Sequence, residues 1–404
     1  MASLHPFRAL RPAPQSVAEV AAVPYDVVNT EEARQLAEGH PLSFLHVSRA
    51  ELGLPSDTDP YADVVYETAR RNYQHLRSAA PLVLEDEPSL YFYRLRMGSH
   101  VQTGLAGGFS VDDYDRDVIL KHEKTRKDKE DDRTRHIVEL RAQTGPVFLT
   151  YQASPEIDAI AARVGATPPL YDFTAADQIQ HSLWRVPASD SAAIVDAFGR
   201  LPRLYIADGH HRAASAARAR AALANGGGAH ESDRFLAVAF PDTQVQILAY
   251  HRLVKDLAGK RPGEILEAVA KTHRVQPGPA VPARKGEVSM FLAGHWHTIT
   301  LQQPQKAKTP GDTLDVSQLH AQVLAPVLGI GDERTDKRID FVGGGRGTGA
   351  LEHAVGSGRA AVAFSLFPVS VRELMAISDA GEIMPPKSTW FEPKLRDGVL
   401  IHEI

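Results

Sequence analysis

Four side chains able to hold an anion, a metal ion or a proton fall within five consecutive positions near the middle of the chain. They are Asp208, His210, His211 and Arg212, with Gly209 between the first two. Arg212 offers a planar fork of donors that suits phosphate or carboxylate, and Asp208 offers a carboxylate that suits a metal ion. The plainer alternative is that Asp208 only caps a helix and that the histidines are ordinary polar residues at its start.

The local sequence pattern predicts the secondary-structure elements around this cluster. Leu204–Ala207 is a short apolar run that predicts a buried strand, and Asp208–Gly209 is a turn pair. From His210 the chain is rich in Ala and Arg, which predicts a helix that stops at Asn225–Gly228. The cluster is therefore expected at a helix N-terminus, where free N–H groups and the helix dipole favour a phosphate.

A second candidate region is the most charged segment of the chain. A short predicted strand, Val118–Leu120, runs directly into a segment of mixed charge that contains His122, Glu123, Lys124, Thr125 and Arg126. Charge runs usually form a solvated helix face, whereas a polar loop directly after a strand is a common place for function. The sequence leaves both interpretations open.

Composition restricts the class of protein. The chain has 404 residues, a formal net charge of −5 and no cysteine, so disulfides, thiolate metal sites and a cysteine nucleophile are excluded. The N-terminus lacks the apolar core of a signal peptide, and no apolar run approaches the roughly 18 residues of a membrane span. We expect a cytoplasmic protein that binds neither nucleic acid nor a membrane. The sequence does not indicate an oligomeric state.

Known catalytic motifs narrow the chemistry further. The glycine-rich run Gly343–Gly347 lacks the Gly-Lys-Ser/Thr ending of a Walker A loop and the spacing of a dinucleotide fingerprint. It remains a weak anion candidate through Arg346, as does Lys387 in the tail. A zinc site at His210 and His211 is disfavoured, because adjacent helix residues point about 100° apart. Carboxylate, histidine, arginine and lysine around an oxygen-bound ion fit phosphoryl transfer or hydrolysis.

Strand and helix patterns alternate through the middle of the chain, which predicts a mixed α/β fold. We expect three parts: an N-terminal α/β layer over 1–85, a catalytic core over 86–255, and a smaller C-terminal α+β unit over 256–404 that contributes to the cleft. Within them, 41–47 is predicted as a strand, and 235–240 with 245–251 as a hairpin.

Tyr205–Ala216 resembles the signature of the ParB/sulfiredoxin superfamily, in which a strand runs into a phosphate-binding turn at a helix N-terminus. Its Asp-Gly-His-His-Arg form is similar to the branch that phosphorylates free serine. Nearly the whole chain also resembles a microbial family catalogued as a domain of unknown function. The stretches that carry this second resemblance are Pro6–Pro12, Pro24–Asp26, His122–Thr125, Gln143–Val147, Ala207–Arg212, Asp336–Phe341 and Met384–Phe391.

The resemblance implies a ParB/sulfiredoxin-like core and a small-molecule kinase that makes O-phospho-L-serine from free L-serine. A glutamate upstream of the turn would take the hydroxyl proton, and Glu123 best fits that order. Asp208 would position Mg²⁺, and the helix N-terminus with Gly209 and Arg212 would hold the donor phosphates. The further residues expected to contact phosphate or take part in catalysis are His210, His211, Lys124, Thr125, Arg126, Arg346 and Lys387.

The phosphate donor implied by the resemblance is ATP, ADP or pyrophosphate, and the sequence does not choose among them. Sulfiredoxin activity is excluded because it needs a cysteine, and no helix-turn-helix module of the ParB type is recognisable after residue 256. Two other functions stay open. One is a phosphatase or nucleotide hydrolase at the same anion site, and the other is a non-catalytic regulatory protein that binds a phosphorylated metabolite.

Overall fold

The computed structural model describes residues 2–79, 82–223, 230–304 and 306–404. Its contacts divide the chain into two units. The first unit is Met1–Val245 together with Pro393–Ile404, and the second unit is Gln246–Glu392. The second unit is thus inserted into the first, whose last residues follow the insertion. The expected division at 85 and 255 into three parts stays a prediction, while the mixed α/β class is confirmed.

A large mixed sheet forms the centre of the first unit, in the order β6-β11-β8-β12-β5-β4-β10-β9, with β1 also paired to β5. Most neighbours are antiparallel, but β6 with β11 and β8 with β12 are parallel. The strands are β1 (Leu4–His5), β4 (Tyr91–Met97), β5 (His100–Ser110), β6 (Ile119–Leu120), β8 (Val147–Tyr151), β9 (Tyr171–Thr174), β10 (Gln180–Arg185), β11 (Leu204–Asp208) and β12 (Arg234–Pro241).

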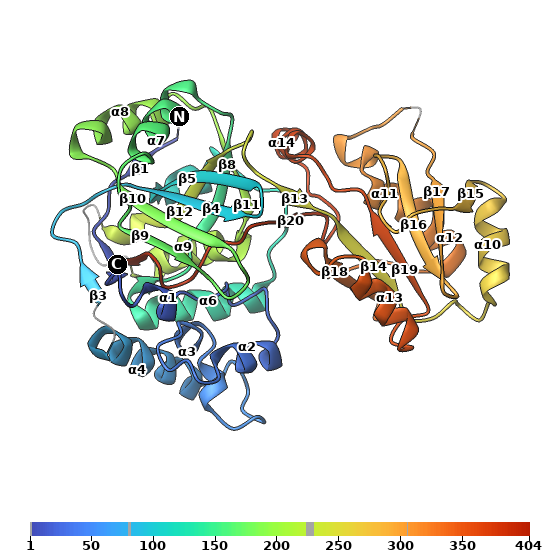
Figure 1. Ribbon diagram of the computed structural model, residues 1–404, viewed down its shortest axis with the longest axis horizontal. Helices are drawn as coiled ribbons and strands as arrows, with labels where there is room; N and C mark the ends of the chain where they lie inside the picture. The colour runs from blue at the N-terminus through green and yellow to red at the C-terminus, as the bar shows by residue number, and fades with distance from the viewer. Residues whose placement is uncertain (1, 80–81, 224–229, 305) are drawn as a thin grey trace. The chain divides into compact units, whose positions relative to one another are not determined.

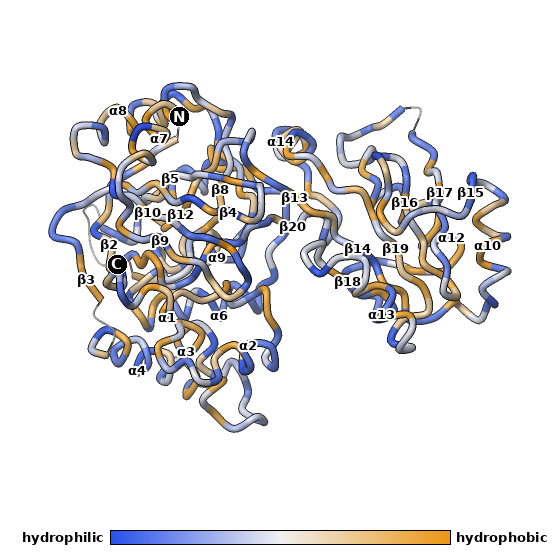
Figure 2. Tube along the Cα trace, in the orientation of Figure 1, coloured by the Kyte–Doolittle hydropathy of each residue, from blue (hydrophilic) through white to orange (hydrophobic). Residues whose placement is uncertain are grey.

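Burial of apolar side chains on both faces of this sheet holds the first unit together. The central strand β12 is apolar at nearly every position and almost wholly buried, as expected of a strand covered on both sides (Figure 2). On one side lie α7 (Pro155–Val164) and α8 (Ala188–Gly199), whose Phe198 ring contacts Phe109 and Tyr151 (Figure 1). Helix α9 (His210–Leu223) packs small alanines into the same core, and α6 (Lys127–Leu140) packs against α9.

The two ends of the chain meet in a smaller sheet of the first unit, in the order β3-β2-β21-β7. Its strands are β2 (Ala9–Pro12), β3 (Leu82–Leu84), β7 (Ala142–Gln143) and the C-terminal β21 (Ile401–Glu403). The N-terminal helices beside it include α1 (Val17–Val20), α2 (Thr30–Ala37), α3 (Leu45–Ser48) and α4 (Asp63–Ala79). Asn29 caps α2 in a capping box with Glu32, as its position in the sequence predicts.

Two predictions of local structure are wrong. The run 41–47 contains no strand, because α3 begins at Leu45 and buries Leu45 and Val47 against α4; a short apolar run does not distinguish a strand from a buried helix. The predicted hairpin is also absent, since β12 pairs with β5 and β8 and the chain leaves the first unit after Val245. The predicted helix stop at Asn225–Gly228 lies outside the described residues.

The second unit is built on an antiparallel sheet in the order β15-β17-β16-β19-β14-β18, with a short separate pair β13-β20. The strands are β13 (Ile247–Leu248), β14 (Tyr250–Val254), β15 (Arg274–Pro277), β16 (Glu287–Leu292), β17 (His295–Thr300), β18 (Ile339–Gly343), β19 (Val362–Leu366) and β20 (Trp390–Phe391). Its helices include α10 (Pro262–Ala270), α11 (Asp315–Leu319), α12 (Ala325–Leu328), α13 (Gly349–Gly356) and α14 (Val371–Asp379).

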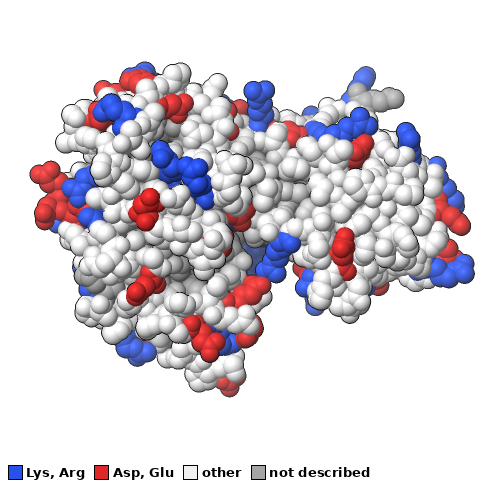
Figure 3. Space-filling model, in the orientation of Figure 1, with Lys and Arg blue, Asp and Glu red and all other residues white. Residues whose placement is uncertain are grey.

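Among the described residues, no helix has the length and apolar character needed to cross a membrane. Basic and acidic side chains are intermixed on the face drawn in Figure 3. On that face they do not gather into one surface of a single sign.

Candidate functional site

The turn between β11 and α9 has the form that the sequence predicts. Strand β11 ends at Asp208 and α9 begins at His210, with Gly209 between them at a φ of +94°. A side chain at Gly209 would be strained by that φ, and its Cβ would lie 3.0 Å from the Arg212 guanidinium. Glycine therefore allows the strand to enter the helix in one step and allows Arg212 to fold back over the turn.

The charged segment reaches this turn because β6 lies parallel to β11. The carboxyl ends of two neighbouring parallel strands meet at one edge of a sheet, so the loop after β6 lies beside the turn after β11. The structure combines the two interpretations of the segment: 121–126 is an irregular loop, and 127–140 is the helix α6.

The two adjacent histidines hold that loop. Nε2 of His210 accepts a hydrogen bond from the backbone N–H of His122 at 3.3 Å. Nε2 of His211 accepts one from the backbone N–H of Arg126 at 3.0 Å. The two rings thus contact opposite ends of the loop, and their direct contribution to catalysis or phosphate binding stays a prediction.

Glu123 lies beside His210, with Oε2 of Glu123 4.0 Å from Nδ1 of His210. Burial, with the nearby His122 ring as a second cause, holds the pKa of His210 well below its ordinary value, so this imidazole is neutral near pH 7. Because Nε2 accepts a hydrogen bond, the single proton is on Nδ1, the nitrogen nearer Glu123. The Glu123 side chain itself is 42% exposed. A carboxylate open to solvent therefore stands next to the start of α9.

Asp208 is paired with two cations. Arg212 Nη2 lies 3.2 Å and Lys394 Nζ 3.4 Å from the same oxygen, Oδ2 of Asp208. Burial by itself would raise the pKa of Asp208, but the charges of Lys394 and Arg212 outweigh it and hold the pKa well below its ordinary value. Asp208 is therefore charged across the neutral range.

Arg212 lies inside the first unit rather than at its surface. It is 8% exposed, donates through Nη1 to the carbonyl oxygen of Pro146, and lies 3.9 Å from Oδ2 of Asp26. Burial opposes its charge, yet the carboxylates of Asp26 and Asp208, among others, raise its pKa above the ordinary value. The internal bonds of Arg212 fix the turn, and its contact with a phosphate stays a prediction.

Comparison with known protein families decides the family. A model described as a protein of unknown function, DUF1015, matches residues 4–317. The chain belongs to the DUF1015 family. The family match includes Glu123, Asp208 and Arg212, whereas Lys394 and the predicted tail stretch 384–391 lie beyond its end. A comparison with curated proteins finds no match.

Solved structures give distant likenesses to this DUF1015 protein. A free serine kinase in complex with AMP has 13% identity and a TM-score of 0.35, with 72% of this chain and 91% of that chain covered. A conserved hypothetical protein from Pyrococcus furiosus has 15% identity and a TM-score of 0.35, with 74% and 95% covered. SbnI with a C-terminal truncation, from Staphylococcus aureus, has 13% identity and a TM-score of 0.38, with 72% and 85% covered.

The remaining predicted site residues of the DUF1015 chain are less closely gathered. Thr125 donates its hydroxyl hydrogen bond to Glu130, and Arg126 pairs with Asp128 at 2.6 Å, so both contact the first turn of α6. Lys124 is exposed on the same loop. Arg346 and Lys387 belong to the second unit. A phosphate contact by any of these residues stays a prediction.

A magnesium ion at Asp208 is compatible with the residues present. Within the described ranges there is no group of three or more histidine and carboxylate side chains that could hold a metal ion. Mg²⁺ does not require one, since it is commonly held by one or two carboxylates, water and the phosphates of a substrate. Asp208 offers one such carboxylate, whose Oδ2 already contacts Lys394 and Arg212, so an ion at that oxygen would compete with both cations.

Sequence reasoning missed three residues that the fold brings to Arg212 or Asp208. None of Asp26, Lys394 and Asp397 is among the site residues predicted from the sequence. The sequence signal for Asp26 is its place in Pro24–Asp26, one of the stretches that carry the resemblance to the family. Lys394 and Asp397 carried no local signal, because they follow the inserted second unit and return to the first.

Proposed function

We propose that this protein is a small-molecule kinase that phosphorylates the hydroxyl of free L-serine at the turn after β11. The observation that carries the proposal is the meeting of two loops at the carboxyl ends of β6 and β11. One loop presents the exposed carboxylate of Glu123, and the other presents a helix N-terminus beside Asp208. A proton acceptor next to an anion-binding position is the arrangement that transfer of a phosphoryl group to an alcohol requires.

Glu123 takes the proton in this proposal. The serine hydroxyl oxygen forms a bond to the terminal phosphorus of the donor, and the bond from that phosphorus to the bridging oxygen of the donor breaks. The hydroxyl proton passes to Glu123, and the donor leaves as the shortened phosphate. His210 and His211 act by holding the loop that carries Glu123, because a base displaced by an ångström loses much of its effect.

The first turn of α9 binds the donor phosphates in this proposal. The N-terminal end of a helix favours negative charge, through its N–H groups and the helix dipole. Mg²⁺ at Asp208 would neutralise charge on the donor phosphates. Lys394, which contacts Asp208, is placed to contribute a positive charge at the same position. The donor is ATP, ADP or pyrophosphate.

The test is ³¹P NMR of the full-length protein with Mg²⁺ and L-serine, in separate tubes with ATP, ADP and pyrophosphate. A phosphoserine resonance in one tube supports the kinase and names its donor. Glu123→Gln should lower the rate by about 100-fold or more, as expected on loss of a general base. Glu87→Gln, which changes an exposed glutamate in the loop before β4, is the matched control and should leave the rate unchanged.

The same tubes distinguish the two other functions. Donor consumption with release of inorganic phosphate and no phosphoserine would replace the kinase by a hydrolase at the same site. Donor binding without consumption in any tube, unaffected by Glu123→Gln, would replace it by a regulatory binding protein.

A further inference from the structure

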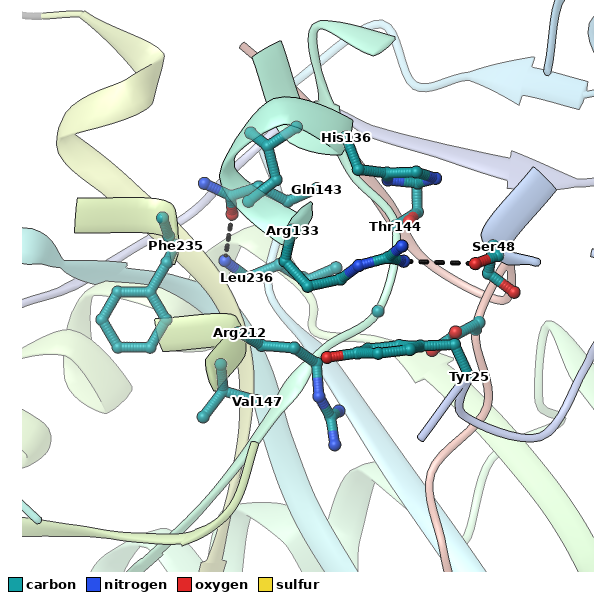
Figure 4. Close-up of a pocket in the computed structure, with 14 residues that line it drawn as sticks. Tyr25, Ser48, Arg133, His136, Gln143, Thr144, Val147, Arg212, Phe235 and Leu236 are labelled. Carbon is teal, nitrogen blue, oxygen red and sulfur yellow. Dashed lines mark hydrogen bonds between the residues drawn. The ribbon is translucent and has the colours of Figure 1, made fainter. Parts of the chain in front are cut away.

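A cavity of about 40 Å³ lies inside the first unit, on the Arg212 side of the turn. It is lined by α6, α9, the segment 143–147 and residues that include Tyr25 and Asp397. This volume exceeds the space that a single water molecule needs. Figure 4 shows the Arg133 guanidinium above the Tyr25 ring, to whose centroid it lies at 4.3 Å, and its hydrogen bond to the backbone oxygen of Ser48.

Three side chains that line this cavity have a buried polar atom without a hydrogen-bond partner among the described residues. The atoms are Ser48 Oγ, Arg212 Nε and Asp397 Oδ1. All three residues are more than nine-tenths buried. Buried polar atoms in native proteins are nearly always hydrogen-bonded, to protein or to ordered water, so three such atoms around one cavity indicate a polar occupant.

The surroundings keep these atoms directed to the cavity. The two Nη atoms of Arg212 are engaged by Pro146 and Asp208, which leaves Nε–H as the donor on the cavity side. At Gly145, which also lines the cavity, a Cβ would come within 2.5 Å of Asp397 Oδ1. Glycine at 145 therefore leaves that carboxylate oxygen open.

The charges select the class of ligand. A simple anion would meet Arg212 favourably and Asp397 unfavourably, and a simple cation would meet both Arg212 and Arg133 unfavourably. A zwitterion pairs with the Arg212 guanidinium through its negative group and with the Asp397 carboxylate through its positive group. The Ser48 hydroxyl can donate or accept a hydrogen bond. Apolar residues such as Ile137, Val147 and Phe235 also line the cavity, as in other small-ligand pockets.

We infer that this cavity binds the head group of a small α-amino acid, with its carboxylate on Arg212 Nε–H and its ammonium on Asp397 Oδ1. The choice of L-serine as probe rests on the proposed function, while the class of ligand comes from the cavity. Arg212 joins the two sites, because its Nη2 contacts Asp208 on the turn. Ligand and phosphate turn are thereby coupled through one guanidinium.

Proton release gives the inference a second readout. Burial raises the pKa of Asp397 to about 7, against the opposing charge of Arg212. An ammonium group next to Oδ1 favours the carboxylate, so Asp397 releases a proton when the amino acid binds near pH 7.

The experiment is calorimetric titration of the full-length protein with L-serine, without phosphate donor, at pH 7 in buffers of different ionisation enthalpy. Ethanolamine, which lacks the carboxylate, and glycerate, which lacks the ammonium, are titrated in parallel. L-Serine should bind with proton release, and both analogues should bind at least about tenfold more weakly. Asp397→Asn should weaken serine binding by about tenfold and abolish the proton release, and Ser48→Ala should weaken binding about threefold.

Matched controls come from the second unit. Asp315 is a buried carboxylate with a raised pKa, and Ser378 is a buried serine whose Oγ has no partner among the described residues. Asp315→Asn and Ser378→Ala should leave serine binding unchanged. If Asp397→Asn fails to fold, Ser48→Ala and Gly145→Ala carry the test, since a methyl group at 145 occupies the space beside Oδ1.

The outcomes separate this inference from the proposed function. Phosphoserine formation with a serine KM unchanged in Asp397→Asn and Ser48→Ala would overturn the cavity assignment and leave the kinase standing. Serine binding that is lost in these variants, without phosphoserine from any donor, would uphold the cavity and overturn the kinase. Absence of serine binding by the unmodified protein at millimolar concentration would overturn the cavity assignment as well.

Discussion

Two turns that combine glycine with arginine follow strands in this protein, one in each unit. The first is formed by Gly209 and Arg212 after β11, and the second by Gly343–Gly347, which begins at the last residue of β18 and contains Arg346. In the first, the chain places Glu123, Asp26 and Lys394 around the turn from three distant segments. In the second, Gly343 and Gly344 are required by neighbours inside the unit; a Cβ at Gly343, for example, would lie 2.5 Å from the Trp390 ring.

The glycines of the two turns differ in the structural role they play. Gly209 supplies a backbone conformation, the positive φ that lets charged residues fold over a helix start. Gly343 and Gly344 supply close approach, to the Trp390 ring and to the backbone oxygen of Ala249. Similar local composition therefore serves a charged cluster in one unit and close packing in the other, and four experiments sharpen that contrast.

The largest effect on the rate is expected when the aspartate at the end of β11 is compared with an aspartate of β18. Asp208→Asn keeps the shape of the side chain and removes the charge that pairs with Lys394 and Arg212. We expect the rate of phosphoserine formation to fall by about 100-fold or more, the range found when an electrostatic group of an active site is removed. Asp340→Asn, at an exposed position of β18, should change it less than about twofold. Equal rates for the two variants would remove Asp208 from the site.

Substitution of Gly209 and of Gly343 by alanine should distinguish a glycine needed for its backbone conformation from one needed for close packing. Gly209→Ala and Gly343→Ala should each destabilise the protein by about 1–3 kcal/mol, the first by backbone strain and the second by overpacking. Only Gly209→Ala should also lower the rate per folded molecule. Urea unfolding and kinase rates, measured on the same samples, check this; a large rate loss in Gly343→Ala would mean that the second turn is part of the site.

Two buried carboxylates, one per unit, give a pH test. Burial raises the pKa of Asp397 to about 7 and that of Asp315 to about 6. Above the ordinary carboxyl pKa of 3.8, the unfolded chain loses a proton that the folded protein keeps, so each group costs stability as the pH rises toward its folded pKa.

The difference in unfolding free energy between Asp397→Asn and the unmodified protein should therefore grow from pH 4 to about pH 7. For Asp315→Asn the same difference should stop growing near pH 6. Urea unfolding at half-unit pH steps measures both. A difference that is flat across this range for Asp397→Asn would show that this carboxyl is already ionised at low pH in the folded protein.

The smallest effects are expected from the predicted arginine contacts at the surface. Arg126→Ala and Arg346→Ala should each raise the KM for the donor less than about threefold, since exposed ion pairs contribute little. Steady-state kinetics with the donor identified by NMR measures both values. A tenfold increase for either variant would place that arginine on the donor phosphates.

Local pattern was enough for elements whose structure depends on near neighbours. The strand from Leu204, the turn at Gly209 and the helix from His210 are present as predicted. Where the local pattern is ambiguous, tertiary contacts decided: the apolar residues near Leu45 form a helix because they pack under α4, although their sequence also suits a strand.

Four of the stretches that carry the family resemblance meet in the first unit. Pro24–Asp26, His122–Thr125 and Gln143–Val147 each contact residues of the turn Ala207–Arg212. Their resemblance to a family was visible in the sequence, but their proximity was not, since Asp26 and Arg212 lie 186 positions apart in the chain.

The sequence by itself determined the strand, the turn at Gly209 and the helix from His210, together with the charged residues they carry, because these depend on residue type and on neighbours within a few positions. Only the tertiary structure decided which groups from distant parts of the chain lie around Asp208 and Arg212. Lys394 and Asp397 reach the first unit after an insertion of a whole second unit. Burial then determines their effect, since a charge removed from water acts strongly on every charged neighbour.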